Sequence, residues 1–379
     1  MAGIYIHIPF CKQACHYCDF HFSTSLKRKS ELVELIAKEA QLRANELSGI
    51  PINTIYFGGG TPSLLSGEEI KSIADKIHGN YRVAPGVEFT LEANPDDLDA
   101  DRLKAFKDAG VNRLSIGIQS FSDKSLKWMN RAHNAKEALN CLALAHEAGF
   151  NNISIDLIYG LPQLTKSVWK EELNRVVDLN IQHVSAYCLT VEAQTALGHW
   201  VKKGKEKPVD EEAAKAQFEM LIEGMDAAGL EQYEVSNFAR EGFHSRHNSA
   251  YWHGEKYIGL GPAAHSFNGI ARSWNVSNNA LYLKALHENS LPSTAEDLTL
   301  TDRFNEWVMT GLRTSKGIDL QMGKKRFDID IAEKYRIEID KLIENKMAHI
   351  HNAHLSLTRK GLFFADGIAA DFFILNHEN

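Results

Sequence analysis

Residues 6–22 read IHIPFCKQACHYCDFHF, and the interpretation of the whole chain starts from this stretch. An apolar, β-branched run leads into it, and three cysteines follow closely: Cys11, Cys15 and Cys18. The chain of 379 residues has only five cysteines, an odd number, so a disulfide framework is not expected. Clustered thiols more often bind metal or do redox work in a reducing compartment, and we therefore expect a cytoplasmic protein.

Two kinds of metal site are compatible with the C-x3-C-x2-C spacing. Structural zinc takes four ligands, and His7, His16 or His21 could supply the fourth. An iron–sulfur cluster held by three thiolates would instead keep one iron open for a substrate or cofactor. The spacing favours the cluster over zinc, and both over three idle thiols.

The rest of the chain alternates short β-branched runs with amphipathic segments, which is typical of βαβ units and a parallel sheet. Polar or glycine-rich residues follow the expected strands, where a (β/α) barrel carries its active site. Six units are too few for a closed eight-fold barrel, so we predict an open, partial (β/α)6 barrel. The expected strands are 4–8, 54–57, 88–91, 113–118, 153–158 and 183–187, and the expected helices are 29–48, 67–79, 99–109, 134–149, 167–180 and 211–228.

The pattern changes twice beyond this barrel. We expect the partial barrel over residues 1–232, an irregular extension over 233–295 and an α+β, winged-helix-like domain over 296–379. The last prediction rests on helices followed by a small strand pair. Within the C-terminal domain the expected elements are helices at 301–313, 331–345 and 359–366 and a strand pair at 347–358 that turns near Asn352.

Composition excludes several classes of protein. The chain is 44% hydrophobic and 24% charged with a formal charge of −7, which suits a globular protein and argues against general nucleic-acid binding. The short basic run Gly323–Arg326 is expected to be a solvated surface. No segment approaches the ~20 apolar residues of a membrane span, and no secretory signal is expected.

The cysteine spacing, with Tyr17 before the third cysteine, resembles the signature of radical S-adenosylmethionine (SAM) enzymes. Further motifs occur in order along nearly the whole chain. Together they resemble the family of oxygen-independent coproporphyrinogen III oxidases and their paralogues, the HemW-type haem chaperones. These motifs are YIHIPFC at 5–11, GGGTPS at 58–63, EANP at 92–95, GIQSF at 117–121, NR at 130–131 and DLIYGLP at 156–162.

The resemblance implies that the three cysteines hold a [4Fe-4S] cluster whose open iron binds SAM. The triple glycine would let backbone approach the amino-acid part of SAM. Glu92, after the third expected strand, could accept hydrogen bonds from hydroxyls of the ligand. Arg131 could donate two hydrogen bonds to a carboxylate. The resemblance implies these SAM-binding residues: Tyr5, Tyr17, Gly59, Gly60, Thr61, Glu92, Gln119, Arg131 and Asp156. Without it, Arg131 and Asp156 would be interpreted as surface or ion-pair residues.

Two departures favour the chaperones over the oxidases. The oxidases have a fourth cysteine where this chain has Phe20, and they carry an extension before the first strand. The chaperone group is also marked by His247-Asn248-x-x-Tyr251-Trp252. Histidine is a common axial ligand of haem iron, so we expect His247 as the ligand, with Tyr251 and Trp252 beside the haem. His244, His253 and His265 are expected to be structural.

The resemblance therefore implies a haem chaperone that passes haem to acceptor haemoproteins, such as respiratory ones, with peripheral membrane association. The alternative is an oxygen-independent coproporphyrinogen III oxidase, an enzyme that decarboxylates two propionates by radical chemistry. No motif identifies the electron donor or the acceptor. The expected cofactors are the cluster, SAM and haem.

Overall fold

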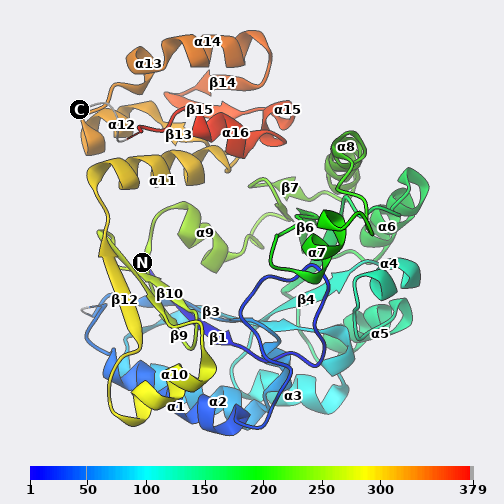
Figure 1. The fold of residues 1–379 in the computed structure, drawn as a ribbon, viewed down its shortest axis with the longest axis vertical. Helices are drawn as coiled ribbons and strands as arrows, with labels where there is room; N and C mark the ends of the chain where they lie inside the picture. Colours follow the sequence, from blue (N-terminus) through cyan, green and yellow to red (C-terminus); the bar gives the residue numbers. More distant parts are fainter. Residues whose placement is uncertain (48, 376–379) are drawn as a thin grey trace.

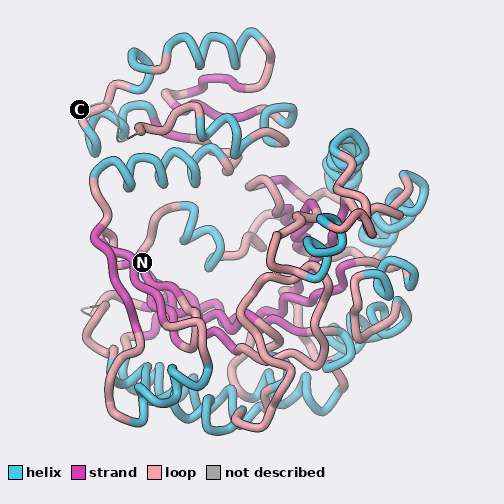
Figure 2. Tube along the Cα trace, in the orientation of Figure 1, coloured by secondary structure: helices cyan, strands magenta, loops and turns pink. Residues whose placement is uncertain are grey.

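A single curved sheet dominates the computed structural model, which describes residues 1–47 and 49–375. Figure 2 shows its strands as one curved wall with helices along the outer side. Among the described residues the strands run in the order β12-β11-β10-β9-β1-β2-β3-β4-β5-β6-β8-β7. Their bounds are β1 Ala2–Ile8, β2 Ile52–Gly59, β3 Val83–Ala93, β4 Arg113–Gln119, β5 Ile153–Tyr159, β6 His183–Cys188, β7 Glu231–Gln232, β8 Asn237–Ala239, β9 Lys256–Leu260, β10 His265–Phe267, β11 Ala271–Asn275 and β12 Ser293–Asp297.

Strands β1 to β6 pair with one another in parallel and in chain order, as the predicted (β/α)6 barrel requires. The sheet does not close, because β12 and β7 form its two edges in the described chain. The predicted fold class is thus confirmed. The helices that accompany these strands are α1 Lys29–Leu42, α2 Gly67–Asn80, α3 Ala100–Asp108, α4 Asp123–Trp128, α5 Ala135–Glu147, α6 Lys166–Asp178, α7 Ala196–Lys202 and α8 Glu211–Ala227, with short 3-10 turns at Pro62–Leu64 and Pro95–Asp97.

The alternation along β1 shows how the sheet separates core from site. Ile4, Ile6 and Ile8 are fully buried in the hydrophobic core. Tyr5 and His7 point to the opposite, concave side, where both line a cavity. Successive side chains of a strand face opposite ways, so one strand supplies both the core and the site.

Segment 233–295 contains more regular structure than its sequence pattern indicated. Strand β9 adds to the open side of β1 in parallel, although the two are separated by the whole barrel in sequence. β10, β11 and β12 then extend the sheet as antiparallel strands. Two helices belong to this segment, α9 Arg246–Trp252 on the concave side of the sheet and α10 Asn279–His287 beside α1 (Figure 1). The division into three domains stays a prediction.

A small antiparallel sheet with helices forms the C-terminal unit, at the top of Figure 1. Its strands run in the order β13-β15-β14, and the predicted turn falls at Asn352 and Ala353, which have φ angles of 48° and 62°. Helix α11 lies between this unit and the curved sheet. The bounds are α11 Leu300–Leu312, β13 Ile318–Asp319, α12 Leu320–Phe327, α13 Ile331–Lys334, α14 Arg336–Glu344, β14 Ala348–His351, β15 His354–Leu357, α15 Arg359–Leu362 and α16 Ala365–Ala370.

Candidate functional site

The cysteine loop follows β1 at the carboxyl edge of the sheet and is tied down at both ends. The amide of Cys11 donates to the Ser23 carbonyl at 3.1 Å. Further on, the amide of His16 donates to the Met129 carbonyl at 3.2 Å, and its ring Nδ1 lies 2.8 Å from the Trp128 carbonyl oxygen. The loop is therefore held against the end of α4, and its cysteines are positioned by backbone contacts.

One cavity of about 470 Å³ brings the three cysteines together with the predicted SAM-binding residues. It opens at the carboxyl ends of the parallel strands, where a barrel of this class carries its chemistry. All of the predicted SAM-binding residues except Tyr5 line it. Those residues are Tyr17, Gly59, Gly60, Thr61, Glu92, Gln119, Arg131 and Asp156.

Two of these side chains contact the cysteine sulfurs directly. Thr61 Oγ1 donates to Cys11 Sγ at 3.4 Å, and Arg131 Nη1 donates to Cys15 Sγ at 3.5 Å. The other end of the Arg131 guanidinium donates to the Asn94 side chain at 2.6 Å and to the Gly117 carbonyl at 2.9 Å. Donors aimed at sulfur are suited to thiolates, since they stabilise the negative charge that metal ligation requires.

The three cysteines have to lose their protons before they can ligate a metal. In the part of the chain that the structure describes, no three His, Cys, Asp or Glu side chains are already arranged around one metal position. Burial raises the pKa of Cys11, and it raises the pKa of Cys18 to about 11. Binding of iron to these cysteines would therefore displace protons.

The glycine edge beside the cysteines has no room for side chains. A Cβ on Gly60 would lie 2.7 Å from the Phe10 carbonyl oxygen, and one on Gly59 would lie 2.5 Å from the His7 ring. Gly59 also has a φ of +105°, which side-chain-bearing residues rarely adopt. Glycine is required at position 60 by the close approach of backbone and at position 59 by the left-handed conformation. As a result, this wall of the cavity is formed by backbone atoms and remains open.

Two carboxyl groups inside the barrel have raised pKa values. Burial raises the pKa of Glu92 to about 7, although its Oε1 accepts from Tyr56 at 2.8 Å and its Oε2 accepts from the Gly59 amide at 3.2 Å. Burial likewise raises the pKa of Asp156 to about 6, and Ser115 donates to it at 3.4 Å. Such groups can accept from, or donate to, the hydroxyls and amines of a ligand near neutral pH.

Helix α9, which carries the His-Asn-x-x-Tyr-Trp segment, lies on the concave side of the sheet. His247 is buried, with Nδ1 2.7 Å from Thr54 Oγ1 and Nε2 2.9 Å from the Tyr251 hydroxyl. Its ring stacks on Tyr56 at 4.9 Å between centroids, and burial lowers its pKa to about 3. Both ring nitrogens are thus engaged, and the predicted axial ligand has no free nitrogen in this arrangement.

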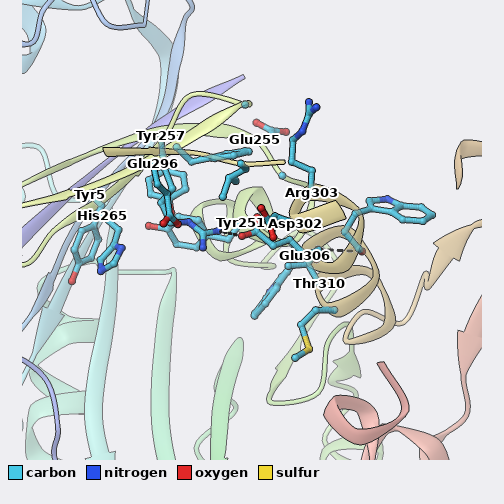
Figure 3. Close-up of a pocket in the computed structure, with 18 of the residues that line it drawn as sticks. Tyr5, Tyr251, Glu255, Tyr257, His265, Glu296, Asp302, Arg303, Glu306 and Thr310 are labelled. Carbon is cyan, nitrogen blue, oxygen red and sulfur yellow. Dashed lines mark hydrogen bonds and ion pairs between the residues drawn. The ribbon is translucent and has the colours of Figure 1, made fainter. Parts of the chain in front are cut away.

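A larger cavity of about 1300 Å³ lies between the β9–β12 part of the sheet and α11. Tyr251 and Trp252 line it, as does Tyr5, which places Tyr5 apart from the other predicted SAM-binding residues. In Figure 3, Tyr5 and His265 lie on the sheet side, and Asp302, Glu306 and Thr310 lie on α11. The cavity also contains aromatic and sulfur-bearing residues that the sequence pattern did not single out: Tyr257, Phe267, Trp307, Met309 and Phe373.

Comparison with known proteins places this architecture in a family. The Radical SAM superfamily matches residues 5–176, and the HemN C-terminal domain matches residues 298–364. The protein named heme chaperone HemW of Bacillus subtilis is 35% identical over 98% of this chain and 99% of its own length. The chain belongs to the HemW family. The HemW proteins of Mycobacterium tuberculosis (32% identical, 97% of this chain and 93% of theirs) and Escherichia coli (38%, 69% of each) are similar relatives.

The solved structure of the coproporphyrinogen III oxidase HemN from Escherichia coli shares the fold of this HemW-family chain. It superposes with a TM-score of 0.83 over 98% of this chain and 89% of the oxidase, at 22% sequence identity. At that identity the likeness concerns the fold alone. Among the described residues, no helix of this HemW-family chain is both long and apolar enough to cross a membrane.

Phe20, the residue at which this HemW-family chain departs from the oxidase pattern, lies where the two cavities meet. It lines both of them, together with Asp19 and Phe22, and its side chain is 66% exposed. An exposed phenyl ring at such a junction offers an apolar surface to a ligand in either cavity. The sequence identified the position through a missing cysteine, but only the structure shows that it separates two sites.

Proposed function

We propose that this chain is a haem chaperone that binds haem in the large cavity and transfers it to acceptor haemoproteins. The single observation that carries the proposal is the aromatic-lined cavity of about 1300 Å³ beside α9 in a chain of the HemW family. Pockets for small ligands usually measure about 300–1,000 Å³, so a porphyrin can be accommodated. Tyr251 and Trp252, which we expect beside the haem, both line this space.

The charge of the lining supports a carrier that releases its ligand. Arg303 and Arg326 line the cavity and could pair with propionates, whereas Arg272 is already paired with Glu306 at 2.8 Å. Six carboxylates also line the cavity and outnumber the three arginines, so the summed charge of the lining does not favour a dianionic porphyrin: Asp19, Glu255, Glu296, Asp297, Asp302 and Glu306. A lining that does not hold the propionates by net charge suits transfer to an acceptor that binds haem more tightly.

The second cavity would hold the cluster and SAM. Cys11, Cys15 and Cys18 would ligate the cluster, Arg131 and Thr61 would donate to its sulfur ligands, and Glu92 would accept from ligand hydroxyls. When bound, the cluster supplies an open iron and an electron for SAM. The protein's own residues position the ligand and restrict water in this cavity. Their place beside the larger cavity is suited to regulating haem binding or release.

A transfer assay separates this proposal from the oxidase alternative. The protein is reconstituted with iron and sulfide under anaerobic conditions, loaded with haem and mixed with an apo-haemoprotein such as apomyoglobin. We expect the haem absorption to move to the acceptor, and we expect no vinyl product when coproporphyrinogen III is supplied with SAM and reductant. Robust decarboxylation without haem transfer would contradict the chaperone and establish the oxidase.

A further inference from the structure

Four histidines line the large cavity, and they differ in how far their ring nitrogens are already used. His7 uses both nitrogens, Nδ1 with the Tyr5 hydroxyl at 3.2 Å and Nε2 with the His21 carbonyl at 2.9 Å. His21 uses Nε2 with the Asn279 side chain at 2.8 Å. His253 and His265 have no side-chain hydrogen bond to any described residue. A haem ligand needs a nitrogen lone pair that is not committed elsewhere. This criterion leaves His21, which keeps Nδ1, together with His253 and His265.

His265 belongs to a strand of the sheet, whereas His21 lies in the loop that follows the cysteines and His253 follows the end of a short helix. His265 is the first residue of β10, and its neighbour Ser266 is buried. Ser266 Oγ accepts from the Gly259 amide at 2.9 Å and lies 3.1 Å from Arg43 Nη2. Because β10 is held through this serine and pairs with β11 and β9, the His265 imidazole is presented from a fixed backbone, as a ligating residue requires.

The surroundings of His265 suit a porphyrin face. Phe267, two residues along β10, also lines the cavity and contacts Tyr257 at 6.4 Å between ring centroids. The His265 ring itself stacks against Trp274 at 6.1 Å. Partial burial of the ring, with the nearby Arg272, lowers the pKa of His265, although the residue is still exposed enough to be reached from the cavity. The imidazole is thus favoured in its neutral form, which is the form that binds metal.

From this geometry we propose that His265, and not His247, provides the axial nitrogen to haem iron in the large cavity. The assignment rests on the proposed haem-binding function and names the atom that fulfils it. His247 instead acts as an internal anchor that fixes α9, so that Tyr251 and Trp252 form one wall of the cavity. These two roles explain why the histidine of the His-Asn-x-x-Tyr-Trp segment is buried and has both ring nitrogens hydrogen-bonded.

The test compares ferric and ferrous haem spectra of the full-length protein and three variants. His265→Ala removes an exposed side chain without a hydrogen bond, so we expect normal folding. We also expect loss of the histidine-ligated absorption and paramagnetic resonance signature, with haem affinity lowered about tenfold or more. His253→Ala is the matched control, an exposed histidine of the same cavity, and should leave both properties unchanged. In His265→Gly, added imidazole should restore the wild-type spectrum.

The possible outcomes separate this assignment from the function on which it rests. If wild-type protein binds haem and His265→Ala gives the same spectrum and affinity, the assignment is overturned and the chaperone proposal stands. If wild-type protein takes up no haem, the chaperone proposal falls and the assignment falls with it. Loss of ligation in His265→Ala with imidazole rescue in His265→Gly supports both.

Discussion

Glu92, which lines the smaller cavity with the three cysteines, shows how one buried carboxyl group makes stability depend on pH. Its pKa is raised by burial to about 7, above its ordinary value near 4.5. The folded protein therefore binds a proton more tightly than the unfolded chain does between those two values. The contribution of Glu92 to the free energy of unfolding is therefore complete below pH 4.5, and it is lost as the pH rises towards 7.

Replacement Glu92→Gln should remove this pH dependence. Between pH 4.5 and 7.5, we expect the free energy of unfolding of the ligand-free variant to fall by about 1–2 kcal/mol less than that of wild type. The reason is that a neutral amide does not become charged in the buried site. Solvent that reaches the cavity keeps the difference this small. Urea denaturation at several pH values measures this, with the exposed Glu68→Gln as control. Parallel curves for wild type and Glu92→Gln would contradict the raised pKa.

His247 is predicted to stabilise the folded protein even when no haem is bound. His247→Ala removes a buried ring and leaves Thr54 Oγ1 and the Tyr251 hydroxyl without partners. We expect a loss of about 2–4 kcal/mol in the free energy of unfolding, measured by chemical denaturation. His253→Ala, one residue beyond α9, should change stability by less than ~0.5 kcal/mol. An equally small effect for His247→Ala would show that its hydrogen bonds do not stabilise the fold.

At the scale of elements, Glu39 of α1 joins the barrel to the strands that extend it. It is fully buried, and its carboxylate accepts from the Gly261 amide at 2.8 Å, the Asn275 side chain at 2.8 Å and the Tyr282 hydroxyl at 2.6 Å. Arg43 of the same network also donates to the Gly259 carbonyl at 2.7 Å. The network therefore fixes β9, β11 and α10 against α1.

Breaking this network should loosen the whole β9–β12 extension. We expect Glu39→Ala to cost about 3–5 kcal/mol, because buried donors lose their acceptor. Glu39→Gln, which keeps one acceptor oxygen, should cost less. The measurement is hydrogen exchange of the amides in β9 to β11, with the exposed Glu34→Ala of the same helix as control. Unchanged exchange in Glu39→Ala would contradict the role given to the network.

The elements that could be predicted from sequence are those with local signals. The six parallel strands and their helices follow from β-branched runs and amphipathic periodicity, and each predicted run falls within the observed strand. β9 was missed because its partner β1 is about 250 residues away and its short run resembles a loop. The motif around His247 does not show whether this histidine is a ligand or a buried hydrogen-bonding group, because both can have the same neighbours in sequence.

Of the two cavities, only the residues of the smaller one could be predicted from sequence. Motif resemblance predicted the residues around the cluster cavity, and the strand ends bring them together, apart from Tyr5. The large cavity was not predictable, because its walls come from β9–β12 and α11, which are distant in sequence and carry no motif in common. The sequence pattern predicts a structural role for His265, and only its place in the cavity, without a side-chain hydrogen bond to a described residue, marks it as a candidate ligand.

At the scale of the whole molecule, two cavities lie side by side and share Asp19, Phe20 and Phe22. The large cavity is lined by the sheet, by α11 and by Arg326 of α12 in the C-terminal unit, and Arg272 of β11 pairs with Glu306 of α11 at 2.8 Å. A ligand in this space contacts both the sheet and the C-terminal unit. Binding should therefore stabilise the contact between them.

Separate cavities imply that haem binding does not require the cluster. A variant with Cys11, Cys15 and Cys18 all replaced by alanine should lose the iron–sulfur absorption after reconstitution. It should still bind haem with the same stoichiometry, and an affinity within about tenfold of wild type. Haem titration of both proteins, reconstituted in parallel, measures this. Complete loss of haem binding in the triple variant would place haem and cluster in one site.

The central claim is that haem occupies the large cavity, and a titration of purified wild-type protein with haem tests it most directly. Absorption in the Soret region and tryptophan fluorescence are followed together, because Trp252 and Trp307 both line the cavity. The account predicts a saturable Soret band at one haem per chain, with quenching that saturates at the same ratio and is smaller in Trp307→Phe. A non-saturating Soret change, or binding without any quenching, would contradict it.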